Sequence, residues 1–231
     1  MSGILTALAG VRPETISPTN IPGLLLWYDA NSPANIISSG AYSQITDLSG
    51  NNNHATQSTP SNRPTQVVAA QNGLNTAQFS GSQYLNLTST LNSGTSYTAF
   101  AVCKRTSVVE FLGNLSVPGN ATLEWYTDDY VYLSCSAGYM RGPYQTSTAY
   151  NALYGLCTGT TGSAIYFNET STSGSTGGGS GDPSNLFSVF GYADSHYCNG
   201  NIGEFGIYSG QVTASQLASL QKYIKVKWAT P

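Results

Sequence analysis

One strong helical pattern closes the chain, and it limits the fold more than any other feature. Across residues 213–228, apolar side chains recur at spacings of three and four, which places them on one face of a helix. These side chains are Leu217, Leu220, Ile224 and Trp228. Thr213 and Gln216 have the spacing of a capping box, which starts a helix. A strand pattern at residues 202–208 comes just before, so we expect the chain to end in a strand and an amphipathic helix.

Upstream of this helix, the chain consists of short strand patterns separated by turns rich in Gly, Asn and Ser. Strands are expected at residues 24–29, 42–48, 66–69, 97–104, 108–113, 121–126, 130–134, 154–158, 164–168 and 188–192. Charged residues make up only 8% of the 231 residues, against roughly 25% in ordinary domains, while 40% are hydrophobic. Many short strands with almost no helix predict an all-β protein, a two-sheet antiparallel sandwich with one C-terminal helix.

Local composition also predicts turns and a domain boundary. Residues 74–79 and 84–87 resemble a hairpin around the turn at residues 80–82. Residues 171–181, STSGSTGGGSG, have the composition of a flexible loop. Three prolines occur at positions 13, 18 and 22, as in an extended segment. We therefore expect an N-terminal arm at residues 1–21 and one β-sandwich at residues 22–231.

Several motifs of the chain follow one another in a recognisable order. They are LLWYDA at 25–30, DLSGNNNHATQ at 47–57, Arg63-Pro64, QFSGSQYL at 78–85 and AIYFN at 164–168. Their order and spacing resemble the laminin-G-like, concanavalin A-like lectin-glucanase jelly-roll domains of phage and bacterial surface proteins. Glu169 departs from that pattern, which has Gly there. The resemblance covers about residues 22–228, and it implies two packed antiparallel sheets that bind glycans or proteins without catalysis.

The spacing of the acidic residues does not suggest a catalytic pair. A glycosidase needs two carboxyl groups about 5–9.5 Å apart, which two residues on one strand face would supply. None of the 11 acidic residues has that spacing, and the adjacent Asp128 and Asp129 would point to opposite faces of a strand. Motifs for a serine nucleophile or a catalytic zinc are also missing. We therefore predict that the protein is not an enzyme, and keep a polysaccharide-degrading glycosidase as the second alternative.

The densest mixture of aromatic and polar residues lies at residues 125–150, and a smaller one lies at residues 192–197. Sugars present apolar patches ringed by hydroxyl groups, so aromatic rings cover the patch while Asp, Asn or Arg bind the hydroxyls. The alternative is that these tyrosines pack in the core or at sheet edges, which is the commoner role of strand aromatics. The predicted glycan-binding residues are Tyr126, Asp128, Tyr130, Tyr139, Arg141 and Tyr144.

The polar loop at residues 47–53 offers oxygen atoms of the kind that Ca²⁺ prefers. Domains of the laminin-G-like type that the motifs resemble often carry such an ion. The candidate ligands in this chain are Asp47, Asn51 and Asn53. The alternative, which we favour, is a loop stabilised by its own Asx turns. No other cofactor is expected.

The four cysteines, Cys103, Cys135, Cys157 and Cys198, lack the spacing of a metal or redox motif. Each falls in a strand-like run, so buried free thiols are the simpler interpretation. One or two disulfides are the alternative, and the sequence does not select their connectivity.

The charge and hydropathy of the chain limit the kinds of partner that it is expected to have. The net charge is −3 and no basic run occurs, so no nucleic-acid partner is expected. No apolar stretch reaches the ~18 residues that span a bilayer, and the first residues lack the basic start of a signal peptide. We therefore expect no membrane insertion and no signal-peptide secretion.

The resemblance and the neutral, hydroxyl-rich composition together suggest a virion surface protein of the tail-fibre or capsid-decoration type. Its lectin-like domain would bind host-cell surface glycans, and residues 1–20 would dock onto other virion proteins. A homo-oligomer is expected, with a trimer favoured. The first alternative is a purely structural decoration or cement protein.

Overall fold

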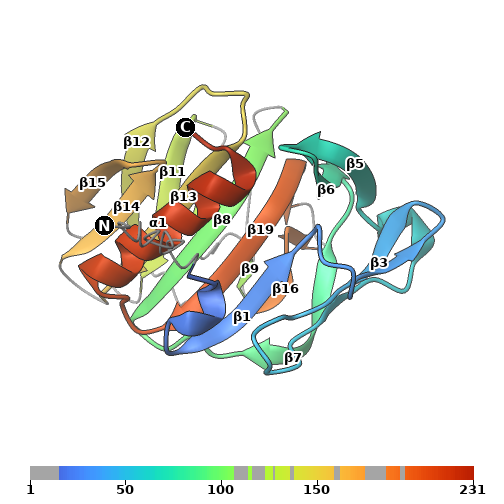
Figure 1. Cartoon of the computed structure of the whole chain (residues 1–231), viewed down its shortest axis with the longest axis horizontal. Coiled ribbons are helices and arrows are strands. Elements are labelled where there is room, and N and C mark those ends of the chain that lie inside the picture. The colour runs from blue at the N-terminus through green and yellow to red at the C-terminus, as the bar shows by residue number, and fades with distance from the viewer. Residues whose placement is uncertain are drawn as a thin grey trace, which may run out of the picture.

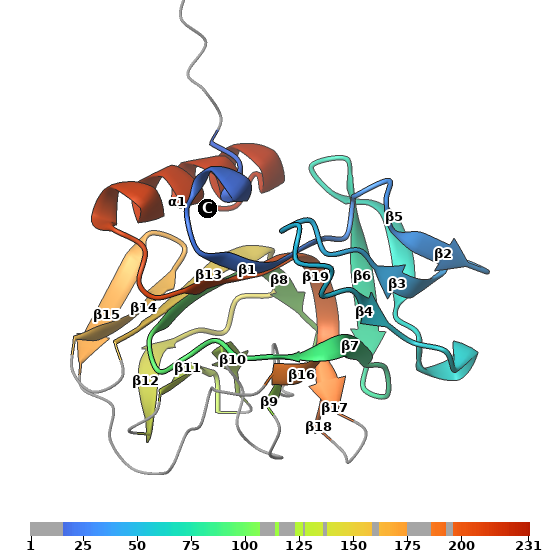
Figure 2. The same ribbon diagram turned by 90° about the horizontal axis from the view of Figure 1, so that it is seen from below.

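Three layers stack on one another: the helix α1 (Ala214–Trp228), a central β-sheet and a second layer of strands (Figure 2). The computed structural model describes residues 16–106, 114–115, 123–126, 128–135, 138–158, 162–174, 186–192 and 196–231. Within these ranges α1 is the one α-helix, and every strand pairing is antiparallel. The predicted all-β sandwich with a C-terminal helix is therefore confirmed.

The central sheet lies under the helix (Figure 1). Its strands, in spatial order, are β15 (Thr170–Gly174), β14 (Ser163–Phe167), β13 (Asn151–Cys157), β8 (Tyr97–Arg105) and β19 (Asn199–Ser209). The long strand β19 is a branch point. Its second half pairs with β1 (Leu24–Asp29), and its first half pairs with β6 (Leu74–Ser80).

Beyond β6 the sheet curls towards the second layer. Its strands there are β5 (Thr65–Gln71), β3 (Ala41–Ile45), β4 (Ala55–Thr56), β7 (Leu85–Leu91), β16 (Leu186–Val189) and β9 (Asn114–Leu115), with β2 (Ile36–Ser38) paired to β3. Short additions are β17 (Gly191–Tyr192), β18 (His196–Tyr197) and the 3₁₀ turns η1 (Pro18–Asn20) and η2 (Pro60–Asn62).

A separate three-stranded sheet completes the second layer. It consists of β10 (Leu123–Trp125), β11 (Tyr130–Cys135) and β12 (Gly138–Tyr144). Figure 2 shows it beside β7 and β16, in the layer farthest from α1. One face of this small sheet therefore packs on the central sheet, and the other face points outward.

Alternation along β8 explains why the central sheet is buried on both sides. Tyr97, Ala99, Ala101 and Cys103 belong to the core between the two strand layers. Phe100 and Val102, at the positions between them, belong to a second core under α1. Because successive side chains point to opposite faces, one apolar strand serves both cores.

The C-terminal helix has the features that its sequence predicts. The backbone N–H of Thr213 donates to Gln216 Oε1 (2.7 Å), and the Gln216 N–H donates to Thr213 Oγ1 (3.3 Å), so the capping box is confirmed. The apolar face is also confirmed, since its four members are all buried: Leu217, Leu220, Ile224 and Trp228. A Cβ atom at Gly203 of β19 would lie 2.7 Å from the Trp228 ring, so glycine at this position admits the indole.

Three local expectations differ from the structure. β6 and β7 do not pair with each other: β6 pairs with β5 and β19, and β7 pairs with β4 and β16. The hairpin instead joins β5 to β6 through Asn72 and Gly73, which both have positive φ as in a two-residue hairpin turn.

The expected loop at 171–181 begins as strand β15, because its Ser and Thr backbone groups pair with β14. Strand β12 was not expected, and the predicted strand at 108–113 lies outside the described residues.

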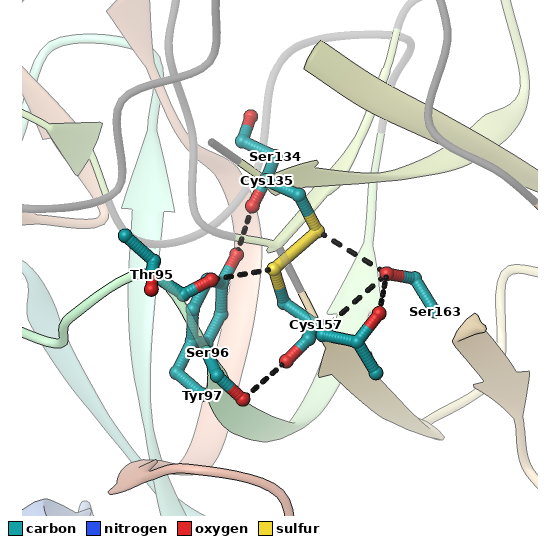
Figure 3. Close-up of a disulfide and its surroundings, with 8 residues drawn as sticks. Thr95, Ser96, Tyr97, Ser134, Cys135, Cys157 and Ser163 are labelled. Carbon is teal, nitrogen blue, oxygen red and sulfur yellow. Dashed lines mark hydrogen bonds between the residues drawn. A yellow bond between two sulfur atoms is a disulfide. The ribbon is translucent and has the colours of Figure 1, made fainter. Parts of the chain in front are cut away.

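A disulfide joins Cys135 of β11 to Cys157 of β13, with Cα atoms 5.9 Å apart (Figure 3). It links the small sheet to the central sheet. Close by, the Tyr97 hydroxyl donates to the backbone oxygen of Ser134, and Ser96 Oγ donates to the backbone oxygen of Cys157 (3.0 Å). The other cysteines, Cys103 and Cys198, are buried free thiols. Burial raises the pKa of both thiols.

The last part of the predicted N-terminal arm, residues 16–21, lies against the sandwich. Ile21 is buried, and the Tyr208 hydroxyl donates to the backbone oxygen of Pro18 (3.0 Å). Residues 1–15 lie outside the described residues, so docking through this segment stays a prediction. No helix in the described ranges is long and apolar enough to cross a membrane.

Candidate functional site

The outward face of the three-stranded sheet carries a group of tyrosines. In β12, Met140 and Gly142 point into the protein, while Tyr139 and Arg141 point out, as strand alternation requires. Antiparallel pairing places Tyr130 opposite Tyr144. We call this face the tyrosine surface. Its members are Tyr126, Tyr130, Tyr132, Tyr139, Arg141 and Tyr144.

Edge-to-face contacts hold these rings in place. The Tyr132 ring lies 5.9 Å from that of Tyr126 and 5.5 Å from that of Tyr139, with interplanar angles of 87° and 67°. Tyr130 and Tyr144 form a further pair at 5.3 Å and 65°. Such contacts are favourable beyond the area they bury, and each ring restricts its neighbour. The tyrosine surface is therefore organised before any ligand arrives, which lowers the entropy cost of binding.

Arg141 and Asp128 add charge to the tyrosine surface. The Arg141 guanidinium lies over the Tyr130 ring, 4.3 Å from its centroid. The Tyr132 hydroxyl donates to Asp128 Oδ2 (2.7 Å). Partial burial, followed by the hydrogen bond and charge of Asp128, raises the pKa of Tyr132 to about 12, and Arg141 opposes this shift. Tyr132 therefore stays a neutral hydroxyl at ordinary pH.

Asp129 is fixed from beneath by a buried arginine. Arg105 forms an ion pair with Asp129, donates to the backbone oxygen of Gln145 (3.2 Å) and stacks on Trp125 at 4.6 Å. The Tyr144 hydroxyl contacts the second carboxylate oxygen of Asp129 (3.4 Å). Asp129 has φ of 69°, in the turn between β10 and β11. This turn places both adjacent aspartates at one edge of the tyrosine surface.

The structure brings all six predicted glycan-binding residues to this one region: Tyr126, Asp128, Tyr130, Tyr139, Arg141 and Tyr144. Tyr132 also belongs there, although the prediction omitted it; its two-residue spacing from Tyr130 on β11 was the available signal. Trp125 and Tyr150, at the two ends of the predicted stretch, are buried instead. In the smaller mixture, residues 193–195 lie outside the described part of the chain.

The loop with the predicted calcium ligands is held by its own hydrogen bonds. Asp47 Oδ1 accepts from the N–H groups of Trp27 (3.0 Å) and Ser49 (2.9 Å), and Oδ2 accepts from Ser49 Oγ and the Asn53 N–H. Asn51 and Asn53 each donate their side-chain amide to the backbone oxygen of Leu25 (3.1 Å). A cation would compete with four donors at Asp47. This arrangement is that of the Asx-turn loop, and calcium binding stays an untested prediction.

A second polar cluster lies on the opposite side of the central sheet, under α1. Glu204 and Asp29 are directly paired across β19 and β1, and Lys227 bridges them, with Nζ 2.9 Å from Glu204 Oε2 and 2.7 Å from Asp29 Oδ2. Sequence spacing missed this carboxylate pair because its members lie on two strands. We call it the Glu204 cluster, and its members are Asp29, Trp27, Glu204, Tyr223, Lys227 and Trp228.

The carboxylate of Glu204 is fully engaged inside the protein. Its Oε1 accepts from Trp27 Nε1 (2.7 Å) and the Tyr223 hydroxyl (2.9 Å), and its Oε2 accepts from Trp228 Nε1 (2.5 Å) as well as Lys227. Its exposed fraction is 0%. Burial raises the pKa of Glu204, and the charge of Lys227 partly opposes this. The cluster locks α1 to the sheet and offers no open carboxylate to a substrate.

Within the described residues, no group of three or more His, Cys, Asp or Glu side chains is arranged to hold a metal ion. No protein-family model matches the chain, and no curated protein matches it in sequence. Solved structures do match in fold, although their sequence identities are low. They support a β-sandwich of the jelly-roll kind without showing its finer type.

Three of these structures show how far the similarity in fold extends. A Trypanosoma rangeli sialidase in complex with sialic acid has a TM-score of 0.58 at 12% identity, over 93% of this chain and 36% of the sialidase. The binding domain of Paraclostridial Mosquitocidal Protein 1 has a TM-score of 0.59 at 14% identity, over 92% of this chain and 56% of that one. Domain 4 of AbnA, a GH43 extracellular arabinanase from Geobacillus stearothermophilus, in complex with arabinotriose, gives 0.53 at 15%, over 86% and 98%.

These comparisons correct one prediction. The sequence led us to expect that the protein is not an enzyme, but a sialidase and a domain of an arabinanase are among the structures that share its fold. The exclusion of enzymatic activity is therefore wrong: carboxylate spacing along single strands was too narrow a test. The chain spans about a third of the sialidase, so the activity of that whole enzyme is not transferred to it.

Proposed function

We propose that this β-sandwich binds carbohydrate through the tyrosine surface. One observation carries the proposal: among the described side chains, the exposed aromatic residues are Tyr126, Tyr139 and Tyr144, and all three lie on this surface. Their exposed fractions are 37%, 46% and 56%. Exposed aromatic rings beside Arg and Asp match what a sugar needs, since the rings cover its apolar face and the charged groups bind its hydroxyls.

Two comparisons support this proposal, because the similar sialidase holds sialic acid and the similar arabinanase domain holds arabinotriose. We assign the sandwich to the concanavalin A-like, laminin-G-like type on the order of its sequence motifs. The location on a virion, the docking through residues 1–20 and the trimer are proposals that rest on the sequence alone.

A glycan array with purified protein tests the binding, followed by titration calorimetry with the best ligand. Tyr130→Ala and Tyr144→Ala each remove one ring of an edge-to-face pair, and each should weaken binding about tenfold, the effect of ~1.4 kcal/mol. Ile36→Ala and Val68→Ala are matched controls, because these side chains are also exposed but lie on β2 and β5. Equal losses in the controls, or none in the tyrosine variants, would reject the tyrosine surface as the site.

The enzymes among the similar structures add a parallel measurement. Release of reducing ends from the bound polysaccharide is followed with the wild-type protein and with Asp128→Asn. Hydrolysis that disappears in the variant would add catalysis to binding at this surface. Hydrolysis that persists would place the catalytic group elsewhere in the chain.

A further inference from the structure

We propose that the tyrosine surface takes an uncharged oligosaccharide of several sugar units rather than an acidic sugar, an inference that rests on the proposed carbohydrate binding. The two sugars seen in similar structures differ in this respect. Sialic acid carries a carboxylate, whereas arabinotriose is neutral. The charges at the tyrosine surface of this chain distinguish between the two classes.

Arg141 is exposed on the tyrosine surface, but the carboxylate of Asp128 lies beside the same group of rings. Asp128 is exposed, and its charge and that of Arg141 both act on the Tyr132 hydroxyl, so both lie near that ring. Asp129 follows directly in the same turn, and its ion pair with Arg105 offsets its charge. The described surface thus has no net positive charge. An anionic sugar that paired with Arg141 would approach the Asp128 carboxylate, and such a like-charge contact is costly.

The same groups suit sugar hydroxyls. An ionised carboxylate only accepts hydrogen bonds, and each hydroxyl of a neutral sugar can donate one. Asp128 accepts from Tyr132 through Oδ2, and a carboxylate has about four acceptor positions, so it retains the capacity to accept more. Arg141, stacked on Tyr130, supplies donors for ring and hydroxyl oxygens. A neutral polyol satisfies both kinds of group without a new charge contact.

The arrangement of rings indicates a ligand longer than one sugar. Tyr126 follows β10, Tyr132 lies on β11 and Tyr139 lies on β12, with ring centroids 5.9 and 5.5 Å apart. The rings therefore form a row across three adjacent strands, and one sugar unit cannot cover the row. Each further unit buries additional apolar area, so affinity should increase with chain length.

Titration calorimetry with the full chain tests this inference. The neutral panel consists of arabinotriose, xylotriose, cellotriose and maltotriose with their monosaccharides, and the acidic panel consists of sialyllactose and trigalacturonate. Each ligand is measured at low and high ionic strength. We expect a neutral trisaccharide to bind more tightly than its monosaccharide, with little dependence on salt. Asp128→Asn should weaken that binding about tenfold, because a hydrogen bond to a charged acceptor is lost.

The control is Glu169→Gln, which removes an exposed carboxylate that pairs with Lys225 of α1, away from the tyrosine surface, and should leave binding unchanged. Tighter binding of an acidic ligand that weakens with salt would overturn the inference while leaving carbohydrate binding in place. If Asp128→Asn leaves the affinity for neutral sugars unchanged, the role assigned to that carboxylate would be overturned. Failure of both panels would reject the proposed function itself.

Discussion

The Glu204 cluster and the tyrosine surface are built from the same kinds of residue, yet one is closed and the other is open. Each combines aromatic rings, two carboxylates and a cation stacked on rings: Lys227 near Trp27, Tyr223 and Trp228, and Arg141 over Tyr130. In the Glu204 cluster, both oxygens of the buried carboxylate accept from protein donors. On the tyrosine surface, the rings and Asp128 are exposed on one side.

This difference between the two regions suggests that one of them determines stability and the other determines recognition. A buried carboxylate keeps its charge only if every partner is in place, so the Glu204 cluster depends on the correct position of α1. An exposed ring and an exposed carboxylate lose little when a neighbour is removed, because water replaces it. The Glu204 cluster should therefore control folding, and the tyrosine surface should control binding.

Removal of the Glu204 carboxylate should have the largest effect on folding. Glu204→Ala removes one of the two carboxylates that pair with Lys227 and leaves the buried indole N–H of Trp228 without its acceptor, and the loss of one partner of a buried pair costs about 3–5 kcal/mol. Urea denaturation gives the change in the free energy of unfolding. Sugar binding, measured where the variant is still folded, should persist. A loss below ~1 kcal/mol would show that the cluster does not hold the helix.

The apolar side of the same helix should have the next largest effect. Leu220 is buried in the core under α1, so Leu220→Ala should lower the free energy of unfolding by about 2–5 kcal/mol. Val226→Ala is the matched control on this helix, because Val226 is 60% exposed, and its effect should stay within about 0.5 kcal/mol. Similar melting temperatures for the two variants would contradict the packing of α1.

The pH dependence of stability sharpens the comparison further. Burial raises the pKa of Glu204, so the folded protein binds this proton more tightly than the unfolded chain, whose glutamates titrate near ~4.3. The stability of wild type relative to Glu204→Gln should therefore fall as pH rises from about 4.3 through the folded pKa, and then level off. Urea titrations of both proteins over this range measure the difference. A difference that grows with pH would show a lowered pKa instead.

How much the sequence predicts depends on whether the contacts are local. The helix was predictable because Thr213, Gln216 and Leu220 lie within one short segment with a clear period. The tyrosine surface was predictable only in part: the dense local mixture of aromatic and polar residues indicated it, but its single face depends on the unexpected strand β12 and on the register shift that brings Tyr144 opposite Tyr130. The Glu204 cluster was not, because Trp27 and Glu204 are 177 positions apart and no spacing rule links them.

Two strands were also missed, because they contain residues that are typical of turns and their pairing depends on distant parts of the chain. β12 contains Gly138, Gly142 and Pro143, which resemble a loop, yet a Cβ at Gly142 would lie 2.9 Å from Ile165, so the glycine allows close packing of two layers. β15 consists of Thr, Ser and Gly, and only its pairing with β14 makes it a strand. Tertiary contacts overrode local propensity at both places.

The smallest effect on stability is expected at the tyrosine surface, and it completes the comparison. Tyr144 is 56% exposed, and its ring contacts mainly Tyr130, so Tyr144→Ala should change the free energy of unfolding by no more than about 0.5 kcal/mol. The same substitution should weaken sugar binding about tenfold. Urea denaturation and calorimetry on one preparation measure both quantities. A stability loss comparable to that of Leu220→Ala would mean that the exposed rings hold the small sheet together, and the division between a closed folding cluster and an open binding face would then fail.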